Sequence, residues 1–195
     1  MQEETLELVK PSIEYVPAYL AMVDEVMQQE GEYPYNNADL AREDFAQFVR
    51  ELEEEAEGIG LPDGFPPQQV YWLLKDGKQI VGEIRFRPVL RPPYEKFNGH
   101  VGYNIRPSQQ GKGYATRQLA LLLDEARRFK LAGISMTIEG DNPASVRVIE
   151  KNGGKLLQSI ENPVKARIMV TDDGELQVVD VVQEGEKLDL YWIDL

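Results

Sequence analysis

Residues 109–115 read QQGKGYA, and this segment carries the most information about the chain. Gly111 and Gly113 flank Lys112 between a strand-like run and a helix-like run. Free backbone N–H groups and the helix dipole at a helix N-terminus both favour negative charge, and glycine lets an anion approach the backbone closely. The segment therefore predicts a binding loop for a phosphate group.

Two common phosphate-binding patterns do not fit this segment. The dinucleotide pattern G-x-G-x-x-G matches Gly111 and Gly113 but then meets Thr116, and no βαβ unit precedes it. The P-loop pattern requires Gly-Lys followed by Ser or Thr. Here Gly113 follows Lys112, so the pattern fails. A nucleotide-binding protein of either kind is therefore disfavoured.

The composition is typical of a globular protein with one domain, 1–195, because 195 residues can bury a substantial core. The net charge of −13 repels nucleic acid and anionic membrane surfaces. No apolar run approaches the roughly 18 residues that span a bilayer, and the N-terminus does not resemble a signal peptide. The chain has no cysteine for a disulfide or a thiolate metal site. We expect a cytoplasmic protein with no metal and no nucleic-acid or membrane partner.

Strand-like and helix-like segments mix without strict alternation, which favours one α/β or α+β domain with a mixed sheet. The pattern predicts helices from Ser12 as N-cap to about Gln29, over 39–57 with Asp39 as cap, over 115–129, and from Asp141 or Asn142 to Gly153. Strands are expected at 4–10, 70–75, 79–89, 97–105, 133–138, 155–160, 166–170, 176–182 and 188–195. The turn-rich stretch 58–67 is either a connection or a flap beside the substrate.

The glycine segment also resembles a family signature. Gln110-Gly111-Lys112-Gly113-Tyr114-Ala115 is similar to the (Arg/Gln)-x-x-Gly-x-(Gly/Ala) loop of the GCN5-related N-acetyltransferases, the GNAT family, which holds the pyrophosphate of acetyl-CoA. The segment NPAS at 142–145, with VIEKNGG behind it, resembles a second motif of that family. GHVGYNIRP at 99–107 and YWI at 191–193 are similar to a bacterial subgroup. The resemblance covers almost the whole chain.

The resemblance implies a GNAT-type fold, with a mixed, mostly antiparallel central sheet flanked by about four helices. It implies acetyl-CoA as cosubstrate and acetyl transfer to a primary amine by direct attack. The alternative is a domain that binds acyl-CoA without catalysis, as a sensor. A small-molecule amine or a peptide amine is the expected acceptor, and a homodimer is compatible with the sequence. The expected cofactor-binding residues are Ile105, Arg106, Gln110, Gly111, Lys112, Gly113, Tyr114, Ala115, Asn142 and Ser145, with Arg117 as a further charge partner.

Several side chains are candidates for catalysis. His100, the only histidine, has a suitable ordinary pKa of about 6.5 for a general base, but it is equally well explained as a structural residue. Glu83 is the other candidate base, although strand alternation places it beside Arg85 and favours an ion pair. The family often has a tyrosine as acid where this chain has Ile149, so Tyr103 or Tyr114 is considered as a substitute, with solvent as the alternative.

Overall fold

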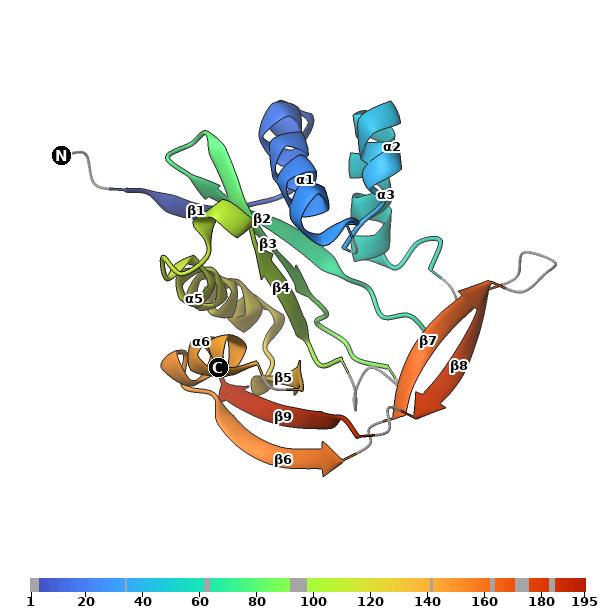
Figure 1. Ribbon diagram of the computed structural model, residues 1–195, viewed down its shortest axis with the longest axis vertical. Helices are drawn as coiled ribbons and strands as arrows, with labels where there is room; N and C mark the ends of the chain where they lie inside the picture. The colour runs from blue at the N-terminus through green and yellow to red at the C-terminus, as the bar shows by residue number, and fades with distance from the viewer. Residues whose placement is uncertain are drawn as a thin grey trace.

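A four-stranded antiparallel sheet lies at the centre of the computed structural model (Figure 1). Its strands, in spatial order, are β1 (Leu6–Val9), β2 (Gln69–Lys75), β3 (Gln79–Phe86) and β4 (Val101–Ile105). The structure describes residues 4–33, 35–61, 64–91, 98–140, 142–161, 164–170, 176–182 and 185–195, of which 164–170 and 176–182 are described by their backbone alone.

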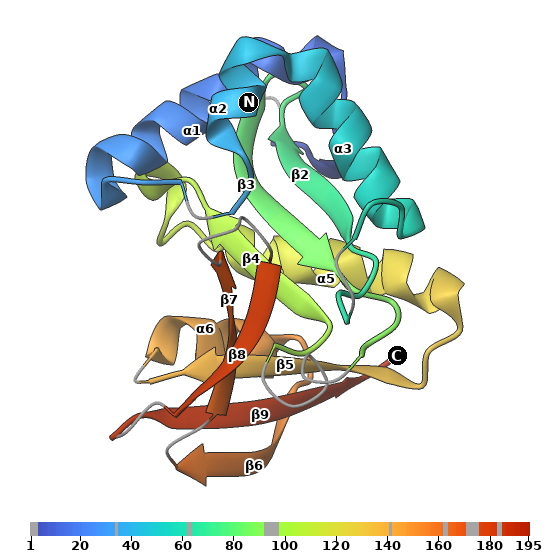
Figure 2. The ribbon, with the colours of Figure 1, turned by 90° about the vertical axis from the view of Figure 1, so that its right-hand side faces the viewer.

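A second antiparallel sheet lies beside the first, in the order β5 (Gly133–Glu139), β9 (Lys187–Asp194) and β6 (Lys155–Glu161). A separate hairpin follows β6 and consists of β7 (Val164–Val170) and β8 (Leu176–Val182) (Figure 2). An isolated bridge between Gly99 and Met136 joins β4 to β5, and His100 N–H donates to the Ser135 carbonyl at 2.8 Å. Gly99 is required there, because a Cβ would lie 2.6 Å from that carbonyl oxygen.

Helices cover both faces of the four-stranded sheet (Figure 2). The helices on one face are α1 (Val16–Glu30), α2 (Ala38–Glu43) and α3 (Phe45–Glu57), and α5 (Tyr114–Ala126) covers the other face beside α6 (Pro143–Lys151). Alternate residues of β2 pack into hydrophobic cores on opposite faces of the sheet. Trp72 packs under α1 and α3, whereas Tyr71 packs toward α5. This arrangement confirms the predicted mixed α/β architecture and its mostly antiparallel strands.

The helix predicted over 39–57 is wrong in one respect, because it is two helices. Asp44 is extended, with φ −144° and ψ 86°, and its carboxylate accepts the N–H of Gln47 at 2.9 Å. An Asp side chain that captures a backbone N–H competes with the helical ladder and caps the next helix. Asn37, not Asp39, caps α2 by accepting the N–H of Leu40. The described residues therefore hold five α-helices where about four were expected.

Other boundaries shift by a few residues. Ser12 caps the short 3₁₀ turn η1 (Ile13–Tyr15) that leads into α1, and the helix after the glycine loop ends in the 3₁₀ turn η3 (Arg127–Phe129). Asn142 is the cap of α6, and Asp141 lies outside the described residues. Parts of the predicted segments 58–67 and 97–105, and the predicted turns at 172–174 and 184, also lie outside them. Among the helices that are described, none combines the length and apolar character needed to cross a membrane.

Candidate active site

The glycine loop connects β4 to α5 through the short 3₁₀ turn η2 (Pro107–Gln109). Gly111 and Gly113 have φ angles of +74° and +81°, in the left-handed region that glycine adopts without strain. A Cβ at either position would meet no atom of the described residues within 4 Å, so the backbone conformation and not crowding requires glycine. Gly113 is the N-cap of α5 and offers no side-chain cap, which leaves the first N–H groups of this helix available to an anion.

A cleft of about 560 Å³ opens at this loop. It is lined by residues from both sequence motifs, which are joined here by residues of α1 and β4. The lining residues are Val26, Glu30, Tyr35, Tyr103, Asn104, Ile105, Gln109, Gln110, Gly111, Gly113, Tyr114, Ala115, Thr116, Asn142, Ala144, Ser145, Arg147, Val148 and Lys151. The N-termini of α5 and α6 therefore face one cavity.

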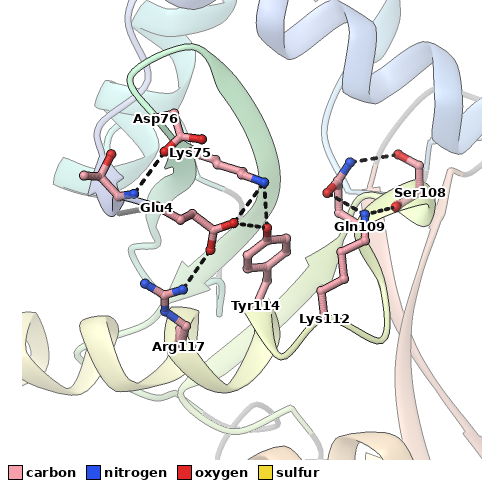
Figure 3. Close-up of polar contacts among 9 residues, drawn as sticks. Glu4, Lys75, Asp76, Ser108, Gln109, Lys112, Tyr114 and Arg117 are labelled. Atoms are coloured by element: carbon pink, nitrogen blue, oxygen red, sulfur yellow. Dashed lines mark hydrogen bonds and ion pairs between the residues drawn. The ribbon is translucent and has the colours of Figure 1, made fainter. Parts of the chain in front are cut away.

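Most of the predicted cofactor residues line this cleft. They are Ile105, Gln110, Gly111, Gly113, Tyr114, Ala115, Asn142 and Ser145. Arg106 and Lys112 are not among the lining residues. Nε of Arg106 donates to Glu25 on α1 at 2.6 Å. Nζ of Lys112 donates to the Ser108 carbonyl at 2.8 Å, as Figure 3 shows. Both cations thus have partners within the protein.

Two cations that sequence reasoning missed line the cleft from α6. Arg147 and Lys151 are four residues apart and therefore lie on one face of that helix. Their spacing from Asn142, which caps α6, was the signal that could have found them. In a chain with a net charge of −13, two positive side chains beside free helix N–H groups suit an anionic ligand.

Tyr114 anchors the first turn of α5 through a polar network on the side away from Lys112 (Figure 3). Its hydroxyl donates to the Glu4 carboxylate at 2.6 Å and accepts from Nζ of Lys75 at 2.8 Å. Arg117, which was considered as a phosphate partner, donates to Glu4 at 2.9 Å. The hydrogen bond from Tyr114, followed by that from Lys75, lowers the pKa of Glu4. A single carboxylate therefore holds three donors around the start of α5.

Glu83 is buried, with 1% of its surface exposed, and it lies outside the cleft lining. Its carboxylate forms an ion pair with Arg85 and accepts hydrogen bonds from Trp72 at 3.1 Å and from Asn36 at 2.8 Å. The predicted ion pair with Arg85 is confirmed. Because the carboxylate already has three donors, the structure gives it a role in holding the connection between α1 and α2 on the sheet.

His100 also lies outside the cleft lining, at the bridge between β4 and β5. Its Nδ1 accepts the backbone N–H of Ser135 at 3.0 Å and lies 2.9 Å from the Ser135 hydroxyl. A backbone N–H can only donate, so the neutral ring carries its proton on Nε2. Burial lowers the pKa of His100. To accept a proton, this ring would have to break its bond to Ser135.

Tyr103 and Ser145 both line the cleft. Burial raises the pKa of the Tyr103 hydroxyl, and the neighbouring Ser145 hydroxyl partly opposes this shift. Ile149 is completely buried in the core that α5 shares with β5 and β9. The structure therefore brings Tyr103 and Ser145 together, whereas His100 and Glu83 lie elsewhere.

The fold is that of an acyltransferase that takes acetyl-CoA as cosubstrate, as a family match shows. A family model described as "Acetyltransferase (GNAT) domain" matches residues 5–155. The chain therefore belongs to the GNAT acetyltransferase family, as the glycine segment and the segment at 142–145 suggested. No curated protein sequence matches the chain.

Solved structures of acetyltransferases share this fold. RimL, a ribosomal L7/L12 α-N-protein acetyltransferase in complex with coenzyme A, has a TM-score of 0.63 at 18% identity, over 98% of this chain and 94% of that one. A GNAT acetyltransferase from Streptococcus pneumoniae has a TM-score of 0.59 at 14% identity, over 99% and 100%. A spermidine N-acetyltransferase SpeG chimera from Vibrio cholerae and hSSAT has a TM-score of 0.55 at 15% identity, over 97% and 94%. At these sequence identities, the similarity shows a shared fold and nothing more.

Proposed function

We propose that the protein transfers the acetyl group of acetyl-CoA to a primary amine by direct attack, without a covalent enzyme intermediate. The observation that carries this proposal is the shared cleft, in which the glycine loop at the start of α5 faces the start of α6. The acceptor would enter from the side of α1, where Glu30 and Tyr35 line the same cleft. A small-molecule amine and a peptide amine both fit this proposal.

The donor half of the cleft fits coenzyme A. Its diphosphate would be held by N–H groups of the loop and of the first turn of α5, where Gly111 and Gly113 allow close approach. Arg147 and Lys151 would supply positive charge from α6. Asn142 accepts the N–H of Ser145 at 3.0 Å and so fixes the start of that helix. Phosphate contacts by Arg106 and Lys112 stay predictions.

Bound acetyl-CoA supplies a thioester whose carbonyl oxygen gains negative charge when an amine attacks. We propose that a backbone N–H of β4 stabilises this charge. The N–H of Arg106 donates to the Val81 carbonyl of β3 at 2.9 Å, and the His100 carbonyl accepts the N–H of Arg87, just after β3, at 2.8 Å. Because the backbone groups of successive strand residues point in opposite directions, Tyr103 and Ile105 direct their N–H groups to the other edge of β4. Both residues line the cleft.

Proton transfer needs an acid for the departing thiolate and a base for the amine. We propose Tyr103 as the acid, because it lines the cleft and a tyrosine hydroxyl is protonated at neutral pH. His100 and Glu83 stay predictions for the base. Since both already hold other partners, we propose that water takes the proton of the amine.

The test is the release of free thiol when the protein is incubated with acetyl-CoA and a panel of amines that contains polyamines, amino acids and peptides. We expect thiol release that depends on one class of amine, and a Tyr103→Phe variant that keeps its KM for acetyl-CoA but loses much of kcat. Binding of CoA without amine-dependent thiol release would instead support an acyl-CoA sensor. An unchanged kcat in Tyr103→Phe would show that solvent, and not Tyr103, protonates the departing thiolate.

A further inference from the structure

We propose that Glu25 on α1 is a positioning residue for the acetyl-CoA loop. One oxygen of its carboxylate accepts Nε–H of Arg106 at 2.6 Å, and the other accepts the backbone N–H of Ser108 at 2.5 Å. Both donors lie between the end of β4 and the glycine loop. A helix on one face of the sheet therefore fixes the turn that leads from β4 into the glycine loop. This inference rests on the proposed function, because it assumes that the loop holds acetyl-CoA.

Hydrogen bonds couple the turn held by Glu25 to the glycine loop. The N–H of Gln109 donates to the Arg106 carbonyl at 2.8 Å, and the N–H of Gln110 donates to the Pro107 carbonyl at 3.2 Å. The side chain of Gln110 also reaches back to the Ile105 carbonyl at 3.2 Å. Gly111 follows immediately. A displacement of the turn would therefore be passed directly to the two glycines.

Ser108 extends this support to Lys112 (Figure 3). The N–H of Ser108 binds Glu25, while its carbonyl accepts Nζ of Lys112 at 2.8 Å. The side-chain oxygen of Gln109 accepts the same Nζ at 3.0 Å. The carboxylate on α1, the turn and the lysine between the glycines thus form one connected set of hydrogen bonds.

The charge state of Glu25 agrees with this role. Burial alone would raise the pKa of Glu25, but the N–H of Ser108 and the guanidinium of Arg106 outweigh burial and lower it. The carboxylate is therefore ionised at neutral pH, the state that accepts both donors. Both partners of the ion pair are largely shielded, with 23% of the Glu25 side chain and 15% of the Arg106 side chain exposed.

This geometry also gives Arg106 a different task from the direct phosphate contact considered from the sequence. Its Nε is committed to Glu25, and Arg106 does not line the cleft. We therefore assign Arg106 to the same positioning unit. If Arg106 contacted phosphate directly, removal of Glu25 would free the guanidinium and strengthen CoA binding. If it acts through Glu25, the same removal would weaken binding.

The test compares Glu25→Gln with Asp24→Asn on the same helix. Asp24 also forms an ion pair, with Arg42 at 2.7 Å, but that pair is more exposed and contacts no part of the loop. We expect Glu25→Gln to raise the Kd for CoA in a calorimetric titration and the KM for acetyl-CoA by about tenfold, since a charge-assisted pair is lost. We expect kcat to change less than twofold. Asp24→Asn should leave all three values at those of the unmodified protein.

A double-mutant cycle with Arg106→Gln separates positioning from direct contact. The two single variants should weaken CoA binding to a similar extent. The double variant should bind CoA little more weakly than either single variant, because each single substitution already breaks the same Glu25–Arg106 pair. Additive losses, or tighter binding by Glu25→Gln, would overturn the proposal. Glu25→Asp, which keeps the charge on a shorter side chain, should bind CoA with intermediate affinity and provides a second readout if Glu25→Gln does not fold.

Failure of this inference can be told from failure of the proposed function. If the unmodified protein binds no CoA, the proposed function is wrong and this inference falls with it. If the unmodified protein binds CoA and Glu25→Gln binds it equally well, only the positioning role of Glu25 is wrong. A loss of melting temperature in Glu25→Gln with an unchanged Kd and KM would likewise show a purely structural ion pair.

Discussion

The hydroxyl of Tyr114 lies 2.6 Å from the carboxylate of Glu4. Tyr114 is the first residue of α5, and Glu4 stands just before β1, so two segments that are far apart in the sequence meet beside the glycine loop (Figure 3). Lys75 at the end of β2 contacts both groups. The start of α5, whose N–H groups bind the cofactor in the proposed function, is thereby fixed to the edge of the sheet.

Replacement of Tyr114 by Phe should therefore impair cofactor binding. The variant keeps the ring that packs at the sheet but loses both hydrogen bonds of the hydroxyl. We expect a higher KM for acetyl-CoA with kcat nearly unchanged, because the Tyr114 hydroxyl takes no part in the proposed transfer step. Steady-state kinetics checks this outcome. Tyr71→Phe, at a buried tyrosine outside the cleft lining, is the matched control and should keep the KM of the unmodified protein.

Replacement of Glu83 by Gln should lower stability more than activity. The change leaves the Arg85 guanidinium buried without its counter-charge, which typically costs about 3–5 kcal/mol. For a chain of this size, each kcal/mol lowers the melting temperature by about 2–4 °C. Thermal unfolding measures the difference from Glu53→Gln, an exposed residue of α3 that should change stability by at most about 0.5 kcal/mol. A stable Glu83→Gln variant without turnover would restore Glu83 as the base.

His100 makes a pH-dependent contribution to stability that Gln cannot make. The pKa of His100 is lowered in the folded protein, mainly by burial. The contribution is therefore fully present above the unfolded pKa of about 6.5 and is lost as the pH falls through the lower folded pKa. We expect the melting temperature of the unmodified protein to fall more steeply toward acid pH than that of His100→Gln.

The same variant tests the catalytic assignment. Because Nδ1 of His100 is bound to Ser135, we expect His100→Gln to keep kcat within about twofold of the unmodified protein at pH 8, far from the losses that follow removal of a general base. A loss of a hundredfold or more, together with disappearance of the acid limb of the pH–rate profile, would establish His100 as the base.

Local patterns in the sequence were sufficient to predict the elements around the site. Two glycines before an amphipathic helix predicted the loop. Gly111 and Gly113 indeed adopt left-handed backbone conformations, which favour glycine. The sequence predicted a cap at Asp141 or Asn142 before Pro143, and Asn142 is the residue that caps α6. Alternation along β3 was enough to place Glu83 beside Arg85. These inferences depend on residues a few positions apart, where spacing determines geometry.

Contacts between distant segments could not be predicted in the same way. Arg106 and Glu25 are 81 positions apart, so no spacing rule joins them. Arg106 therefore looked free to bind phosphate when only its neighbours in the sequence were considered. The break at Asp44 was hidden for another reason: Ala41 and Phe48 keep one helical period across it, and both are buried against the same core.

The most direct test of the account is a calorimetric titration of CoA into the unmodified protein and a Gly113→Ala variant. Alanine in the left-handed conformation of Gly113 costs about 1–2 kcal/mol, so the loop should shift and CoA should bind about tenfold or more weakly. Gly77→Ala in the β2–β3 turn, where φ is +64°, carries a similar strain and should bind CoA as the unmodified protein does. Absence of CoA binding, or equal binding by Gly113→Ala, would contradict a cofactor site at this loop.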